Sequence, residues 1–213
     1  MLLHEYRIAA QRKLHRKIMQ KRNKNMDFTI IAQNCIGGVI YSDLGLQFLS
    51  PTINMFIEDK NFVKLVENLE YYLSISAEPL TEKYIDPVDN SITYPKIKIK
   101  DIEICCLHYK DCKEAIDAWE RRKKRVNLNN VFVIGNSWNM HGNIELMQKI
   151  CNSSYKSVLF SNIELDVNNC VYLKDDFWKL DKRGIIRPNI TDFKPNSYRR
   201  YYEEYFDVVS WIN

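Results

Sequence analysis

The chain has 213 residues, of which 46% are hydrophobic, 12% aromatic and 27% charged, and this is enough to bury the core of one domain spanning 1–213. No run approaches the roughly 18 apolar residues of a membrane-spanning helix, and residues 1–25 lack the apolar block of a signal peptide, so we expect a cytoplasmic protein. The net charge of +4 is uneven, because residues 1–25 carry eight Lys or Arg and a single Glu, whereas residues 26–213 are slightly acidic.

The basic segment 1–25 is predicted to form a helix. An apolar stripe recurs along it at helical spacing and consists of Leu3, Tyr6, Ala10, Leu14 and Ile18. We expect this stripe to pack on the domain while the lysines face water, because basic residues ring the helix, whereas an interfacial helix keeps its cations on one face. Transient contact with anionic lipid is the second interpretation. Nucleic acid is not expected as a partner, because no aromatic-rich basic groove accompanies the charge.

The rest of the chain alternates predicted strands and helices. Runs rich in β-branched and aromatic residues predict strands at 28–35, 52–57, 97–107, 131–136, 157–162 and 170–173, with a turn or bulge at 100–101. Helical spacing and capping residues predict helices at 60–74, 111–123, 142–152 and in the tail from 198. Residues 77–96 contain three prolines and read as an irregular excursion with a small hairpin. Near-continuous apolar strands alternating with helices predict a three-layer α/β/α fold with a mostly parallel central sheet.

The segment from Phe28 to Asn54 carries the first candidate site. A predicted strand ends in Asn34-Cys35 and meets the pair Gly37-Gly38, which would leave bare backbone N–H groups at the carboxyl edge of the sheet. Such an edge suits the anionic or sugar part of a ligand. The spacing matches neither the Walker loop nor GxGxxG, and a tight turn that needs two glycines is the alternative. The further candidate ligand-binding residues of this segment are Tyr41, Ser50, Thr52 and Asn54.

Cysteine chemistry offers a second possibility. A thiol at Cys35, beside a helix N-terminus, would have a lowered pKa, and His108 is the best candidate for its base. The alternative is an inert buried cysteine, as is usual for reduced intracellular proteins. Cys105, His108 and Cys112 have a metal-like spacing, but no second half supplies the remaining zinc ligands, so no metal is expected.

The third candidate is the helix segment from Trp119 to Asn127. Arg122 and Arg125 lie one turn apart on a face shared with Trp119, and together they could neutralise a phosphate beside a stacking platform. The neighbouring candidates are Arg121 and Asn127. The alternative is a set of cations that only complement the helix dipole. Asp175-Asp176 follows a predicted strand and could hold a metal, although a solvated strand end is the preferred interpretation.

Four ordered segments resemble a bacterial family of unknown function whose members are often labelled exopolysaccharide biosynthesis proteins. They are N-C-x-G-G-x-x-Y (34–41), L-G-L-x-F-x-S-P-T-x-N (44–54), W-x-R-R-x-x-R-V-N (119–127) and the ending F-D-V-V-x-W-I-N (206–213), with His108-Tyr109 between them. The resemblance implies a cytoplasmic α/β/α protein linked to surface-polysaccharide loci. It carries over no catalytic residues and names no cofactor.

The leading hypothesis is therefore a transferase acting on a sugar or sugar nucleotide, with His108 as base. The alternatives are a non-catalytic binding or assembly partner in a polysaccharide locus, and a hydrolase built on Cys35 and His108.

Overall fold

The computed structural model describes residues 2–86, 89–137, 140, 142–173, 179–180, 186–187 and 189–213. Its helices are α1 (Leu2–Arg22), α2 (Ile36–Leu44), α3 (Asp59–Glu67), α4 (Leu69–Ser74), α5 (Cys112–Lys123), α6 (Ile144–Cys151), the 3₁₀ helix η2 (Tyr201–Glu204) and α7 (Val208–Ile212). Its strands are β1 (Thr29–Ala32), β2 (Glu78–Pro79), β3 (Tyr84–Ile85), β4 (Thr93–Tyr94), β5 (Lys96–Ile99), β6 (Ile102–Cys105), β7 (Val131–Asn136), β8 (Lys156–Ser161), β9 (Cys170–Tyr172), β10 (Lys179–Leu180) and β11 (Ile186–Arg187).

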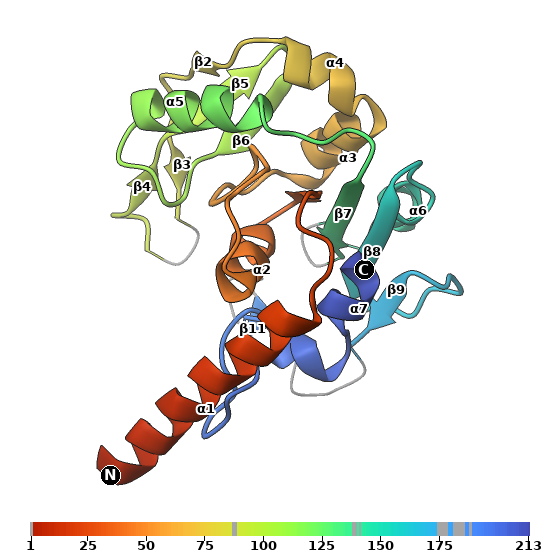
Figure 1. Ribbon diagram of the computed structural model, residues 1–213. Coiled ribbons are helices and arrows are strands. Elements are labelled where there is room, and N and C mark those ends of the chain that lie inside the picture. The colour runs from red at the N-terminus through yellow and green to blue at the C-terminus, as the bar shows by residue number, and fades with distance from the viewer. Residues whose placement is uncertain are drawn as a thin grey trace.

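The central sheet has the strand order β1-β7-β8-β9, and all its neighbouring strands are parallel. Every residue of β1 and β7 is buried, which explains why these strands read as continuous apolar runs. Helices flank the sheet in Figure 1, so the predicted fold class is confirmed.

Two hydrophobic cores lie on opposite faces of this sheet. Ile31 and Val133 belong to the core that contains α3, α5 and α6, whereas Ile30 and Ile134 belong to the core that contains α1, α2 and α7. The helix that directly follows β1 therefore lies on the opposite face from the helix that follows β7. In open α/β sheets, ligands bind at the carboxyl ends of two neighbouring strands whose following helices lie on opposite faces of the sheet.

A smaller antiparallel sheet, β2-β5-β6, continues from the outer side of β1. Segment 55–57 makes the connection, because Phe56 exchanges both backbone hydrogen bonds with Cys105 at 2.8 Å and the Ile57 N–H donates to the Gln33 carbonyl at 3.0 Å. The predicted strand at 52–57 is thus reduced to one bridge, since residues 51–54 form a turn in which Asn54 has a φ of 61°.

Side chains from the next two segments close the outer edge of β1. The Tyr41 hydroxyl donates to the Phe28 carbonyl at 2.7 Å and accepts from the Ile30 N–H at 3.1 Å. The Thr52 hydroxyl accepts from the Ala32 N–H at 3.2 Å. An edge strand otherwise presents unpaired backbone groups, and here they are satisfied within the chain.

Other sequence expectations need small corrections. The helix predicted at 60–74 is interrupted at Asn68 and forms α3 and α4. The turn at 100–101 joins β5 to β6, and Lys100 adopts a left-handed φ of 59°. The excursion at 77–96 does contain a small hairpin, in which β3 pairs with β4. Asp175-Asp176 lies outside the described residues.

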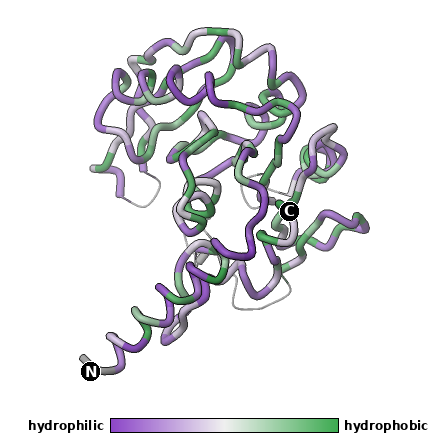
Figure 2. The backbone as a smooth tube through the Cα atoms, in the orientation of Figure 1, coloured by the Kyte–Doolittle hydropathy of each residue, from purple (hydrophilic) through white to green (hydrophobic). Residues whose placement is uncertain are grey.

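The packing of α1 contradicts the expected apolar stripe. Tyr6, Leu14 and Ile18 are exposed to 71%, 59% and 48%, whereas the buried residues among the described side chains of the helix are Ile8 and Met19. The side chain of Leu3 lies outside the described part of the structure. Hydrophobic and hydrophilic residues alternate along this helix in Figure 2, and Figure 1 shows it projecting from the body. The inner side combines these two apolar residues with arginines, since Arg12 and Arg22 bond to the C-terminal segment and Arg16 pairs with Asp43 of α2. No helix in the described part of the chain is long and apolar enough to cross a membrane.

Candidate functional site

Polar side chains gather where the parallel strands of the central sheet end. Gln33 follows β1 and is fully buried, and its Oε1 accepts from the backbone N–H of Asn136 at 3.1 Å and from the Asn136 Nδ2 at 3.2 Å. A backbone N–H only donates, so the Gln33 oxygen must face it and the Nε2 must lie on the other side. This buried Nε2 has no hydrogen-bond partner within the described ranges. It is an unused donor at the carboxyl end of the sheet.

A second pair joins the ends of β7 and β8. The Ser137 hydroxyl donates to Asn162 Oδ1 at 2.6 Å and accepts from the Asn162 N–H at 3.0 Å. Ser137 is buried and Asn162 is exposed, so this pair runs from the end of the sheet to the surface. We call Gln33, Asn34, Asn136, Ser137 and Asn162 the strand-end cluster.

Asn34 links the cluster to the first turn of α2, since its Oδ1 accepts from the Ile36 N–H at 3.1 Å. The first N–H groups of a helix lack intrahelical partners and favour anions. The predicted glycine bend is wrong in detail, because Gly37 and Gly38 lie inside α2. A Cβ on Gly37 would come within 3.2 Å of the Ala32 Cβ, so this glycine allows α2 to approach β1 closely.

The cluster consists of amides and one hydroxyl, with no charged side chain. Such groups both donate and accept hydrogen bonds, which suits a polyhydroxylated ligand such as a sugar. The described residues contain no group of three or more His, Cys, Asp or Glu arranged to hold a metal ion.

The remaining candidates from the segment 41–54 divide by role. Tyr41, Ser50 and Thr52 are buried, and they bond to the backbone of β1 or to each other. Their role is structural. Asn54 is the exception, since its Oδ1 lies 3.2 Å from the position of a Cβ on Gly38, at the first turn of α2.

The tryptophan-arginine segment does not form a free phosphate clamp. Trp119 is fully buried in the core and offers no stacking face. Arg122 donates to the Tyr109 hydroxyl at 2.5 Å and to the Ile53 carbonyl at 3.4 Å, and Arg125 donates to the Phe48 carbonyl at 3.4 Å. These two arginines therefore attach loop 46–54 to α5 and to the turn that follows it.

The last two candidates of this segment also lack a binding role in the structure. Arg121 is exposed on another side of α5. Asn127 bonds through its Nδ2 to the carboxylate of Asp27 at 2.9 Å and through its N–H to the Thr29 hydroxyl at 2.9 Å. Asn127 thus positions the start of β1.

The proposed thiol dyad is not formed. Burial raises the pKa of the Cys35 thiol to about 11, against the direction expected from the helix N-terminus. His108 lies exposed in the turn after β6, and no hydrogen bond joins it to Cys35 in the described structure. Burial also raises the pKa of Cys105 and of Cys106 to about 12, so these thiols are unreactive at neutral pH.

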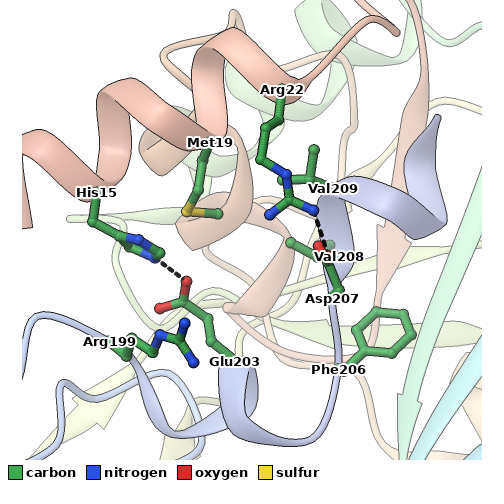
Figure 3. Close-up of a pocket in the computed structure, with 9 residues that line it drawn as sticks. All are labelled: His15, Met19, Arg22, Arg199, Glu203, Phe206, Asp207, Val208 and Val209. Carbon is green, nitrogen blue, oxygen red and sulfur yellow. Dashed lines mark hydrogen bonds and ion pairs between the residues drawn. The ribbon is translucent and has the colours of Figure 1, made fainter.

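A cavity of about 160 Å³ lies between α1 and the C-terminal segment. Figure 3 shows His15 turned toward Glu203 and Arg22 turned toward Asp207, each as a polar pair. Ligand pockets are usually about 300–1,000 Å³, and these four polar side chains already have partners. We interpret this cavity as the joint between α1 and the tail.

Sequence reasoning found Asn34 but missed Gln33, Asn136, Ser137 and Asn162. A usable signal was present, because a polar pair lies at the carboxyl end of each of these buried strands: Gln33-Asn34, Asn136-Ser137 and Ser161-Asn162. Parallel strands bring such pairs to one edge.

Two comparisons with known proteins each cover nearly the whole chain. The chain is 28% identical over 206 residues to an uncharacterized protein of Haemophilus influenzae, and the match covers 95% of this chain and 92% of that protein. Residues 7–213 match the family described as "Domain of unknown function (DUF1919)". The chain therefore belongs to the DUF1919 family.

Proposed function

We propose that this protein binds a sugar or sugar nucleotide at the strand-end cluster and acts on it as a transferase in surface-polysaccharide assembly. The observation that carries the proposal is the buried Gln33 Nε2, which has no partner within the described ranges. A buried donor without an acceptor costs about 1–3 kcal/mol, so a ligand oxygen at this point would recover that free energy.

Two further features support this ligand class. The neutral amides and hydroxyl of the cluster match sugar hydroxyl groups, and the first turn of α2 suits a phosphate oxygen. The link to polysaccharide rests on the sequence resemblance described above.

His108 is retained as the proposed base of the transferase. The adjacent Tyr109 donates to the Ile53 carbonyl at 2.8 Å, and the Ile53 Cγ2 lies 3.2 Å from the position of a Cβ on Gly38. The turn that carries His108 is thus attached to the segment beside α2.

A non-catalytic binding partner is the second candidate. It is favoured by the chemistry of the cluster, in which no member is an acid or a base at neutral pH. The hydrolase gains no support, because the Cys35 thiol is protonated at neutral pH and is not bonded to His108.

A thermal-shift panel of nucleotide sugars, with and without a divalent metal, tests binding. A ligand at about 100 times its Kd adds about 2.7 kcal/mol, which raises the Tm of a chain of this size by roughly 5–10 °C. Asn162→Ala should reduce the shift, and Asn168→Ala, an exposed asparagine in the turn before β9, is the matched control. The absence of any shift across the panel would refute the ligand class.

Release of free nucleotide in the presence of acceptor glycan separates the two candidates. Steady release that depends on His108 supports the transferase. Binding without release supports the non-catalytic partner.

A further inference from the structure

The inner face of helix α1 is bonded to the rest of the protein. Arg12 Nε donates to the Ser197 carbonyl at 3.2 Å, and Arg16 Nε lies 2.8 Å from Asp43 Oδ1 as an ion pair. His15 and Arg22 pair with acidic residues of the tail, as Figure 3 shows. These contacts fix which side of the helix faces outward.

The outer face combines apolar and cationic side chains. Tyr6, Leu14 and Ile18 are exposed apolar residues separated by multiples of four, so they follow one line along the helix. A second line beside it consists of Lys13, Lys17 and Lys21, which are exposed and form no ion pair with any described residue.

Negative charge is missing from this outer face. Glu5 is the acid of α1, and at 100° per residue it falls in the sector of Arg12 and Arg16, on the inner side. Arg12, Arg16 and Arg22 are held by the inner face, whereas the exposed Arg7 falls in the sector of Leu14 and Ile18 and adds a positive charge to the outer face. The outward charge is therefore one-sided, which is the arrangement of an interfacial helix.

We propose that the outer face of α1 docks on an anionic lipid surface, with the helix lying parallel to the membrane. The apolar line would enter the boundary between headgroups and acyl chains, while the lysine stems extend and place their ammonium groups at the phosphates. Residues 1–25 carry a net +7 and the remaining chain a net −3, so an anionic surface attracts the helix and repels the body. A second copy of α1 fits poorly as the occupant, because two such faces would bring lysines together.

A shallow depression extends this face at the end of the helix. It has a volume of about 470 Å³ and is lined by Ile18, Lys21, Arg22, Lys24, Ser210 and Asn213. Lys21 and Lys24 lie at its rim, neither forms an ion pair with a described residue, and their ammonium groups suit a lipid phosphate group.

Vesicle co-flotation of the full chain tests the proposal. We expect binding to vesicles of phosphatidylcholine with about 30% phosphatidylserine, and little binding to pure phosphatidylcholine. The triple variant K13Q/K17Q/K21Q should weaken the partition coefficient about 100-fold, at about 1 kcal/mol for each lysine. The double variant L14S/I18S should weaken it by at least about tenfold, because the apolar contribution is lost.

The matched control is K60Q/K83Q/K110Q, which removes three exposed lysines from the body with the same change in net charge. Its partition should stay within about twofold of the parent. Equal binding of all variants, equal binding to both vesicle types, or no binding to either would overturn the proposal. Unchanged Tm values of the variants show that the chain remains folded.

Discussion

The buried carboxylate of Asp43 provides the sharpest test of how α1, α2 and the tail are held together. Its side chain is 4% exposed and bonds to Arg200 through both oxygens, at 2.5 and 3.1 Å, while Arg16 reaches it from α1. Arg200 is itself 12% exposed, so it is poorly solvated without this partner.

Asp43→Asn keeps the shape of the side chain and removes the charge. Breaking a buried ion pair costs about 3–5 kcal/mol, because the remaining ion is left uncompensated. The retained amide oxygen still accepts one hydrogen bond, so we expect about 3 kcal/mol and a decrease in Tm of roughly 6–12 °C. Urea denaturation followed by circular dichroism measures the loss.

The control is Asp117→Asn, which breaks an exposed pair with Lys113 and should leave the free energy of unfolding almost unchanged. D43N combined with R200Q should lose less than the sum of the two single losses, because the two groups interact directly. Arg16→Gln should cost less than D43N, since Arg16 is 43% exposed. If D43N costs no more than D117N, the buried pair does not fasten the tail to α2.

Three further predictions concern the segments that the sequence singled out. Thr52→Val leaves a β1 amide without its acceptor and should cost about 1–3 kcal/mol in urea unfolding, whereas Thr81→Val, at an exposed site, should change little. Arg122→Met should lower the free energy of unfolding by about 1–2 kcal/mol, and Arg121→Met should lower it by less than about 0.5 kcal/mol. Equal losses would contradict the structural role of Arg122. Burial holds the pKa of Cys35 at about 11, so its alkylation by iodoacetamide should still accelerate between about pH 8 and 10, and a plateau below that range would disprove the raised pKa.

The parallel sheet was predictable because its determinants are local. Strands β7 and β8 are built around the short apolar runs 131–134 and 158–160. Asp111 caps α5 by accepting from the Glu114 N–H at 2.8 Å, as its spacing indicates. Near neighbours in the sequence decide such features.

The candidate site was less predictable, for two reasons. A buried aromatic and a stacking aromatic have the same spacing on a helix, so Trp119 could be assigned to either role until the core was placed. Gln33 meets Asn136 across 103 positions, and no local pattern reports a contact of that range.

The orientation of α1 also depends on contacts between residues that lie far apart in the sequence. Its arginines have partners near the other end of the chain, such as Arg12 with Ser197, and those contacts decide which side of the helix faces inward. The apolar stripe alone gave the opposite orientation.

The sealed outer side of β1 also bears on how the chain folds. Its Ile30 amide is satisfied by Tyr41, only 11 positions away, whereas its ladder with β7 joins residues about a hundred positions apart. Short loops close sooner and at lower entropic cost than long ones. During synthesis, a nascent chain can therefore protect the outer edge of β1 long before β7 is made and pairs with its inner edge. This shortens the time in which β1 could pair with a wrong strand.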